Sequence, residues 1–196
     1  LDDEIVFFCK KNRIKYFRGD ENNVLKRFVD LIKINNFKYI LRVCSDNPFI
    51  DLNLIKTLTK FADLKNDYIS YFLDDNTPVI KTHYGVFTEL IKTDSLKNVL
   101  NTTNNEEDLE HVTKYIYENP TLFQIKYLKT PNYIQSNKNI RLTIDTQKDF
   151  ELLSEIYSKT SNRKDDLKST FDYINLNKTL KKEMVNNILR NQKWHT

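Results

Sequence analysis

The sequence predicts an α/β fold with a mostly parallel mixed sheet. Helical and strand patterns alternate along most of the chain, which is typical of βαβ units. The run 37–44 is a short apolar stretch of β-forming residues between two amphipathic helices, as expected of a buried strand. It ends at Ser45-Asp46-Asn47-Pro48, residues that favour a turn. Since ligands of open α/β sheets bind at the carboxyl ends of strands, Asp46 is a candidate site residue.

The expected elements of the first half of the chain are each defined by a periodic pattern. The helix over 21–35 is the clearest, because its apolar residues fall on one face. Asp51 is expected to cap the next helix. The predicted helices are 2–11, 21–35, 51–62 and 93–100, and the predicted strands are 14–17, 37–44, 67–73 and 85–91.

The second half is expected to contain more helix than strand. Asn119-Pro120 ends one helix, because the residue before a proline disfavours the helical conformation. We expect an α/β domain over 1–160 and a helical extension over 161–196, with a charged linker at 162–169. The predicted helices are 106–118, 147–158, 171–174 and 178–191, and the predicted strands are 123–128 and 140–144.

Composition excludes several classes of protein. The chain has 196 residues, of which 39% are hydrophobic, enough for a substantial core, and its net charge of +4 is dispersed, which argues against nucleic-acid binding. Its two cysteines, Cys9 and Cys44, are too few and too far apart for a disulfide framework or a zinc site. No apolar run approaches the roughly 20 residues of a membrane span. We therefore expect a cytoplasmic protein without a membrane partner.

Two aspartates follow strand-like stretches that each contain an arginine. Asp46 follows 39–44, and Asp145 follows 140–144. Two such carboxylates can converge on one Mg²⁺, an ion that binds one or two carboxylates together with nucleotide phosphates. The alternative is purely structural, with Asp46 in an Asx-turn and Asp145 capping the next helix.

The two arginines of these stretches, Arg42 and Arg141, have two interpretations. A guanidinium can bind a phosphate or a sugar carboxylate through paired hydrogen bonds. Each could instead be the internal partner of Asp46 or Asp145.

Two further features are weaker candidates. Arg18 and Gly19 precede a helix N-terminus, a place where anions bind, although an ordinary turn accounts for them better. His111 could bind a ligand, but a single helical histidine is more often structural or exposed.

Five motifs in a fixed order resemble one protein family. Residues 17–28 (FRGDENNVLKRF) resemble its FRG motif, and 42–51 (RVCSDNPFID) resemble its Arg-x-Thr-x-Asp-x-Pro motif. Residues 85–89 (GVFTE) keep the spacing of a Gly-x-Asp-x-Glu motif but with a phenylalanine at the aspartate. Residues 110–117 (EHVTKYIY) and 141–150 (RLTIDTQKDF) complete the set. Together they resemble the cytidylyltransferase family, in its spore-coat polysaccharide biosynthesis protein F group, related to CMP-sialic acid and CMP-Kdo synthetases.

The resemblance implies a fold, a reaction and roles for particular residues. The fold would be a Rossmann-like three-layer sandwich of the nucleotide-diphospho-sugar transferase type. The reaction would transfer CMP from CTP to an acidic sugar or sugar phosphate for a surface polysaccharide, releasing pyrophosphate. Asp46 and Asp145 would bind Mg²⁺, with Arg141 also catalytic. The substrates would contact Arg18, Gly19, Arg42, Glu89 and His111.

The chain departs from the family pattern at its start. The family begins with a strand and a Gly-x-Arg-x-x-x-Lys loop that holds the nucleotide phosphates, and no such loop occurs in these residues. We expect about 50 residues, one strand–loop–helix–strand unit, to precede Leu1. The alternative is a catalytically inactive relative that serves as a binding or assembly module. Leu180, Met184 and Ile188, together with Trp194, could form a homodimer interface, but simple packing of this stripe against the sheet is the preferred interpretation.

Overall fold

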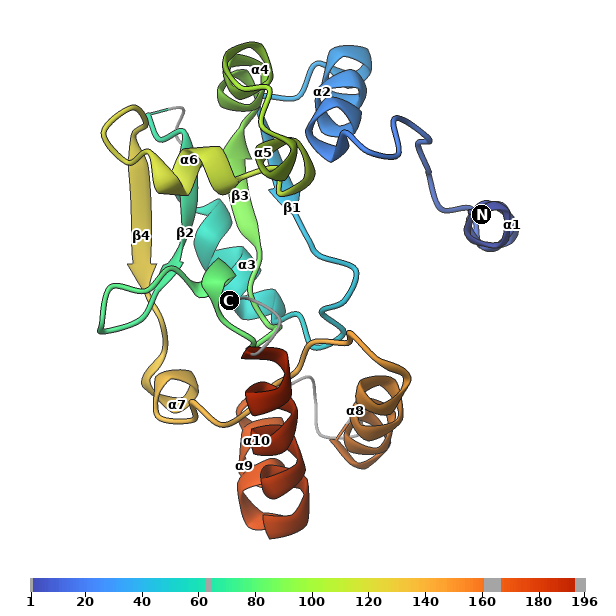
Figure 1. Ribbon diagram of the computed structural model, residues 1–196, viewed down its shortest axis with the longest axis vertical. Coiled ribbons are helices and arrows are strands. Elements are labelled where there is room, and N and C mark those ends of the chain that lie inside the picture. The colour runs from blue at the N-terminus through green and yellow to red at the C-terminus, as the bar shows by residue number, and fades with distance from the viewer. Residues whose placement is uncertain (1, 63–64, 161–166, 193–196) are drawn as a thin grey trace. The chain divides into compact units, whose positions relative to one another are not determined.

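The computed structural model describes residues 2–62, 65–160 and 167–192 and forms a mixed α/β structure (Figure 1). The chain divides into two compact units, one of residues 1–40 and 92–123 and the other of residues 41–91 and 124–196. In chain order the elements are α1 (Asp3–Lys11), α2 (Val24–Asn35), β1 (Tyr39–Arg42), α3 (Leu52–Thr59), β2 (Tyr68–Phe72), the 3₁₀ helix η1 (Val79–Lys81), β3 (Glu89–Lys92), α4 (Thr93–Thr102), α5 (Glu106–Glu110), α6 (Lys114–Glu118), β4 (Ile125–Lys129), α7 (Asn132–Gln135), α8 (Gln147–Thr160), α9 (Leu167–Leu176) and α10 (Lys178–Gln192).

The four strands form one sheet in the order β1-β3-β2-β4. β2 pairs with β3 in antiparallel fashion, Tyr68 opposite Ile91, and with β4 in parallel fashion, Tyr68 opposite Ile125. The prediction of an α/β fold with a mixed sheet is thereby confirmed. The prediction of a buried strand over 37–44 is wrong in extent and burial: β1 spans Tyr39–Arg42, lies at the end of the described strand order, and has half-buried residues.

The first unit is a cluster of helices around α2. Leu25, Val29 and Ile32 form the buried face of α2, at the helical spacing that the sequence predicted. This face packs against α4 and α5. The Asn23 side chain caps α2 by accepting a hydrogen bond from the Lys26 N–H, at 2.7 Å. The unit is therefore held by burial of apolar side chains between amphipathic helices.

The second unit contains most of the sheet, and helix α3 lies alongside β2 (Figure 1). The Tyr71 hydroxyl of β2 donates a hydrogen bond to the Leu54 carbonyl of α3, at 2.9 Å. Asp51 caps α3 as predicted, since its carboxylate accepts hydrogen bonds from the N–H groups of Asn53 and Leu54. The segment after Arg42 is thereby fixed at both of its ends, by β1 and by α3.

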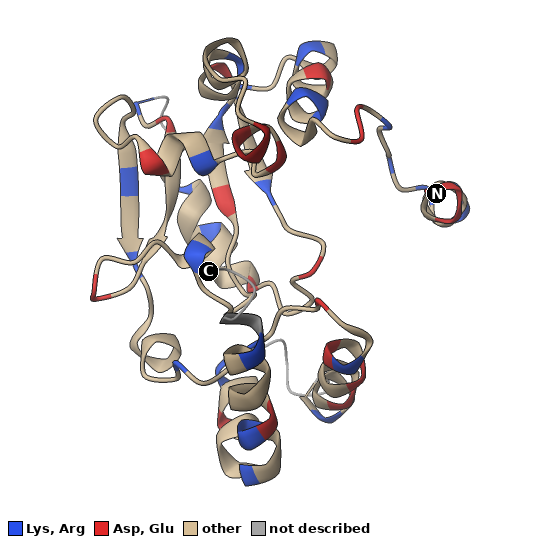
Figure 2. Ribbon diagram, viewed as in Figure 1, with Lys and Arg blue, Asp and Glu red and all other residues tan. Residues whose placement is uncertain are grey.

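The C-terminal helices of the second unit pack together, α9 against α7, α8 and α10. Their surfaces carry both signs of charge (Figure 2). Leu180, Met184 and Ile188 of α10 are buried within the chain, so this stripe packs internally. Trp194 and residues 161–166 lie outside the described residues, and the predicted division at residue 160 remains a prediction.

Several predicted elements differ from the structure. The predicted linker 162–169 overlaps α9, which begins at Leu167 and extends beyond both ends of the predicted helix 171–174. Residues 14–17 and 140–144 are not strands, and the strand predicted over 85–91 is confined to Glu89–Lys92. The helix predicted over 106–118 is broken into α5 and α6. In residues 140–144 the N–H groups of Leu142 and Ile144 bond to two separate loops instead of forming a strand ladder. None of the helices that the structure describes is long and apolar enough to cross a membrane.

Replacing Asp51 with alanine is expected to lower the free energy of unfolding by about 1 kcal/mol, because two N–H groups at the start of α3 lose their acceptor. The measurement is urea unfolding of the wild-type and variant proteins. Asp51→Asn is the control, since an asparagine side chain still accepts these bonds. Equal losses for both variants would contradict the capping role.

Candidate functional site

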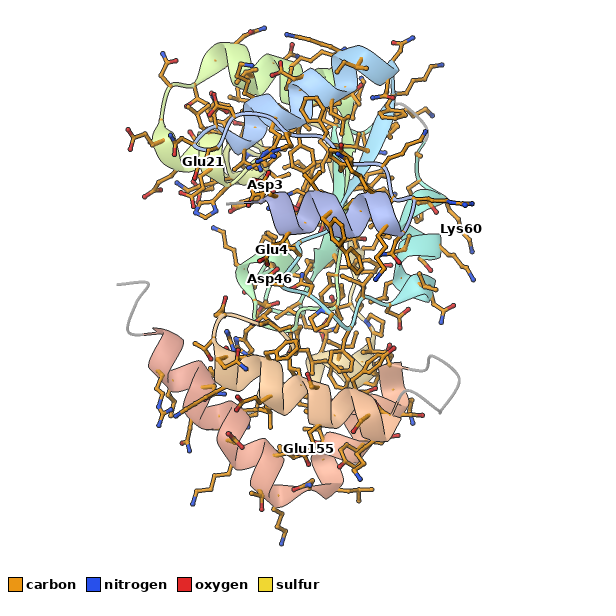
Figure 3. The ribbon with its side chains drawn as sticks, turned by 90° about the vertical axis from the view of Figure 1, so that its right-hand side faces the viewer. Asp3, Glu4, Glu21, Asp46, Lys60 and Glu155 are labelled. Carbon is orange, nitrogen blue, oxygen red and sulfur yellow. The ribbon has the colours of Figure 1, made fainter. Side chains whose placement is uncertain are left out.

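The candidate site lies in the second unit, where two loops meet the segment 140–144. The Ile144 N–H donates to the carbonyl of Asp46, at 2.9 Å, and the Leu142 N–H donates to the carbonyl of His83, at 3.2 Å. The segment therefore connects the loop after β1 with the loop before β3. Figure 3 shows the Asp46 side chain on the first of these loops.

Gly85 makes this close arrangement possible. It has a positive φ of 64°, a conformation that favours glycine. A Cβ atom at this position would lie 2.4 Å from the Leu142 carbonyl oxygen. The backbone of the segment 140–144 therefore lies directly against Gly85.

A pocket opens beside this contact, and polar and apolar groups share its lining about equally. Arg42 and Glu89 provide opposite charges, and Asp46 provides a second carboxylate. The hydroxyl groups come from three threonines, and Asn47 adds an amide. The full lining is Arg42, Cys44, Asp46, Asn47, Val79, Ile80, Thr82, Gly85, Phe87, Thr88, Glu89 and Thr143.

A buried row of side chains crosses three neighbouring strands at the pocket. Glu89, on β3, has a side chain that is only 4% exposed. Its carboxylate forms an ion pair with Arg42 of β1 and accepts a hydrogen bond from the Tyr68 hydroxyl of β2, at 2.5 Å. Burial raises the pKa of Tyr68, and the neighbouring Glu89 raises it further, so the hydroxyl keeps its proton. Burial lowers the pKa of Arg42, but the Glu89 carboxylate, together with Cys44 and Tyr68, raises it by more, so the net pKa is raised.

Cys44 lies in the same pocket as a thiol. Burial raises the pKa of Cys44. The Arg42 guanidinium lowers it by less, so the net pKa is raised. A thiol with a raised pKa is a weak nucleophile. Cys44 is therefore a pocket-lining side chain with no sign of activation.

Arg141 and Asp149 hold the loop that contains Asp145. The Arg141 guanidinium is buried and forms an ion pair with the Asp145 carboxylate, and a longer one of 3.9 Å with Asp149. Burial lowers the pKa of Arg141, although the carboxylates of Asp149 and Asp46 act to raise it. The Asp149 carboxylate also accepts hydrogen bonds from the N–H groups of Asp145 and Thr146. The Thr146 hydroxyl accepts from the Asp149 N–H in return, a capping box at the start of α8.

The structure brings Asp46 and Asp145 to the same region, and neither has its proposed structural role. The Asp145 carboxylate does not cap α8, since Thr146 and Asp149 form that cap. Among the described residues, the Asp46 carboxylate accepts no hydrogen bond from an N–H group of its own turn. The internal pairing of Arg141 with Asp145 is present, whereas Arg42 pairs with Glu89 instead of an aspartate.

The donor set suits Mg²⁺ in its chemistry. Carboxylate oxygens are hard ligands, and Mg²⁺ commonly takes one or two of them with phosphates and water. The Asp46 carboxylate lines the pocket, and the Asp145 side chain is half-exposed. No group of three or more His, Cys, Asp or Glu side chains in the described part of the chain could hold a metal ion. An ion at Asp46 would thus complete its coordination with ligand and water oxygens.

Three predicted site residues, Arg18, Gly19 and His111, belong to the first unit. Arg18 pairs with Asp3 at 2.6 Å, on the surface. The Asp20 carboxylate accepts from the N–H groups of Asn22 and Asn23, so an internal acceptor already occupies the turn that was a candidate anion site. The His111 side chain is exposed, in the break between α5 and α6.

The sequence assigned no role to several residues that line or support the pocket. Gly85 was noted only as the first residue of the motif 85–89, although it is one of only two glycines in the chain. Thr143 lies two residues before Asp145. Tyr68 gave no signal, since a tyrosine in a strand is ordinary.

Comparison with known proteins places this chain in a family. The model of a family described as cytidylyltransferase matches residues 2–188. The chain belongs to the cytidylyltransferase family. The family resemblance inferred from the motifs is therefore confirmed.

Two relatives of this cytidylyltransferase-family chain are each 33% identical to it. One is an uncharacterised protein of Methanocaldococcus jannaschii, MJ1063, aligned over 183 residues that make up 92% of this chain and 71% of the relative. The other is the spore coat polysaccharide biosynthesis protein SpsF of Bacillus subtilis, aligned over 166 residues, 84% of this chain and 65% of the relative.

A solved structure has the same fold. It is a cytidylyltransferase from Leptospira borgpetersenii, with a TM-score of 0.78 and 22% identity over 91% of this chain and 73% of that one. The Rossmann-like fold expected for the cytidylyltransferase family is thus confirmed.

Replacing Gly85 with alanine is expected to lower the free energy of unfolding by at least about 2 kcal/mol. An alanine at this position would have to keep a left-handed backbone conformation, which is strained for a residue with a side chain. Its Cβ atom would also collide with the backbone of Leu142. Thermal and urea unfolding measure the loss. Gly19→Ala is the control, because its φ is not positive and its Cβ would meet the side chains of Arg27 and Phe17. Equal effects of the two substitutions would contradict the account of Gly85.

Proposed function

We propose that the protein transfers CMP from CTP to a sugar, in the cytoplasm, as a step in the synthesis of a surface polysaccharide. Membership of the cytidylyltransferase family over residues 2–188 is the observation that carries the proposal. The name of the relative from B. subtilis, which refers to spore coat polysaccharide, supports the class of product. The polar groups of the pocket beside Asp46 support a ligand with many oxygen atoms.

In the proposed reaction an oxygen of the sugar attacks the α-phosphorus of CTP. A bond forms between this oxygen and the α-phosphorus, and the bond from the α-phosphorus to the bridging oxygen of the β-phosphate breaks. Pyrophosphate leaves with the electron pair of the broken bond. If the attacking group is a hydroxyl, its proton passes to water; if it is a sugar phosphate, no proton is released.

Asp46 and Asp145 are the residues that would hold Mg²⁺. When bound, this ion would neutralise negative charge on the phosphates. The electrostatic influence of Asp46 on Arg141, and the Ile144–Asp46 hydrogen bond, support a shared role for the two loops. Because Asp145 is paired with Arg141, Asp145 would have to exchange that partner to bind the ion.

Arg141 and Arg42 are the cations of this region, and they differ in their surroundings. Arg141 lies between carboxylates and is buried, so its first role is to hold the loop of Asp145 in place. Arg42 lines the pocket and is available to a substrate on that side. A guanidinium there can donate hydrogen bonds to oxygen atoms of a phosphate or of a sugar.

The test is pyrophosphate release by the full-length protein with CTP, Mg²⁺ and a panel of acidic sugars and sugar phosphates. We expect release with at least one acceptor and none without Mg²⁺. A thermal shift with CTP but no release with any acceptor would favour a binding module over an enzyme. Absence of both responses would contradict the proposal.

Asp46→Asn and Asp145→Asn should each lower the rate at least about a hundredfold while the proteins stay folded, because each removes a negative ligand of Mg²⁺. The measurement is the initial rate of pyrophosphate release, with circular dichroism as the check on folding. Asp172→Asn is the matched control, since this exposed carboxylate on α9 pairs with Lys168. Wild-type rates in either site variant would overturn the metal assignment.

A further inference from the structure

The row Tyr68–Glu89–Arg42 begins in the core and ends at the pocket. Tyr68 is fully buried and Glu89 nearly so, whereas the Arg42 side chain is 16% exposed and lines the pocket together with Glu89. Each carboxylate oxygen of Glu89 has its own donor: the Tyr68 hydroxyl bonds to Oε1, and an Arg42 nitrogen bonds to Oε2. Tyr68 therefore fixes the carboxylate that in turn fixes the guanidinium.

This arrangement restricts the orientation of Arg42. A carboxylate with a single partner can rotate about its terminal bond, but one held at both oxygens cannot do so without breaking a buried hydrogen bond. The bond to Glu89 engages one terminal nitrogen, NH1, and a guanidinium has further N–H donors in the same plane. With the guanidinium plane fixed, the direction of the remaining donors is fixed as well.

The charges of the pocket indicate which ligand these donors suit. The lining contains one guanidinium, of Arg42, and two carboxylates, of Glu89 and Asp46, so without a bound cation it has no excess of positive charge. The other polar lining groups are neutral: the hydroxyls of Thr82, Thr88 and Thr143, and the Asn47 amide. Neutral groups of this kind form hydrogen bonds with the hydroxyl groups of a sugar.

We propose that Tyr68 is a positioning residue, which through Glu89 holds Arg42 so that it donates hydrogen bonds to sugar hydroxyl groups in this pocket. The proposal deepens the proposed function, on which it rests for the identity of the reaction. It assigns Tyr68 a role in sugar affinity although Tyr68 itself lies too deep to touch a ligand.

Tyr68→Phe tests the proposal, because it removes only the hydroxyl that bonds to Glu89. We expect KM for the sugar to rise about tenfold, because one well-oriented hydrogen bond to the sugar is lost. KM for CTP should stay unchanged. Tyr71→Phe is the matched control: Tyr71 is a buried tyrosine of the same strand whose hydroxyl bonds to Leu54. Tyr71→Phe should lower the free energy of unfolding about as much as Tyr68→Phe does, and it should leave KM for the sugar and KM for CTP unchanged. Equal KM effects in the two variants would overturn the proposal.

A double-mutant cycle tests whether Tyr68 acts through Arg42. In an Arg42→Gln background, Tyr68→Phe should change KM for the sugar less than about twofold, since the donor it positions is gone. A full tenfold effect in that background would show that Tyr68 acts by another route and would overturn the proposal.

Alkylation of Cys44 gives a readout that needs no turnover. Cys44 lies in the pocket, and Cys9, on α1, is the internal reference in the same protein. Glucose, as a neutral probe at high millimolar concentration, should slow the reaction of Cys44 with iodoacetamide in the wild type, and slow it less in Tyr68→Phe. Glucuronate tests whether a carboxylate strengthens protection. Protection by glucuronate but not by glucose, equal protection in both proteins, or no protection at all would contradict the proposal.

The two ideas fail in different ways. If no sugar supports pyrophosphate release but glucose protects Cys44 in a manner that depends on Tyr68, the proposed function fails and the positioning role stands. If release occurs and Tyr68→Phe leaves KM for the sugar unchanged, the proposed function stands and the positioning role fails.

Discussion

Burial of the Glu89 carboxylate is the constraint on which the site depends. An ionised carboxylate removed from water costs several kcal/mol unless it is paired and hydrogen-bonded. Here the partners come from the two strands beside β3, Arg42 from β1 and Tyr68 from β2. The strand order β1-β3-β2 is therefore also the order of the partners, and the stability of the sheet is coupled to the geometry of the pocket.

A second constraint is the close contact at Gly85. The segment 140–144 reaches Asp46 because its backbone can lie against a residue without a side chain. Asp149 then fixes the following loop through its hydrogen bonds to residues 145 and 146, and the Asn187 amide of α10 bonds to the same carboxylate, at 3.2 Å. The C-terminal helices thus contribute to the position of Asp145 even though they lie outside the pocket.

The sequence predicted the helices better than the strands and the pairing of side chains. Apolar spacing located α2, and the Asp51 cap was correct, because both depend on neighbours in the chain. Residues 140–144 have the composition of a strand but bond to loops. Their hydrogen-bond partners lie far away in the chain, so the local sequence could not predict them. The pairing of Arg42 with Glu89, 47 residues away, was not predicted for the same reason. Motifs identified the family, since five of them in order carry more information than any single pattern.

The most direct test of the central claim, that this chain belongs to an enzyme that joins CMP to a sugar, is phosphorus NMR of a complete reaction. The full-length protein is incubated with CTP, Mg²⁺ and the acceptor sugar. The account predicts a new phosphorus signal of CMP bonded to the sugar, together with an equal amount of pyrophosphate. Free CMP without a sugar-linked product, or an unchanged spectrum of CTP, would contradict it.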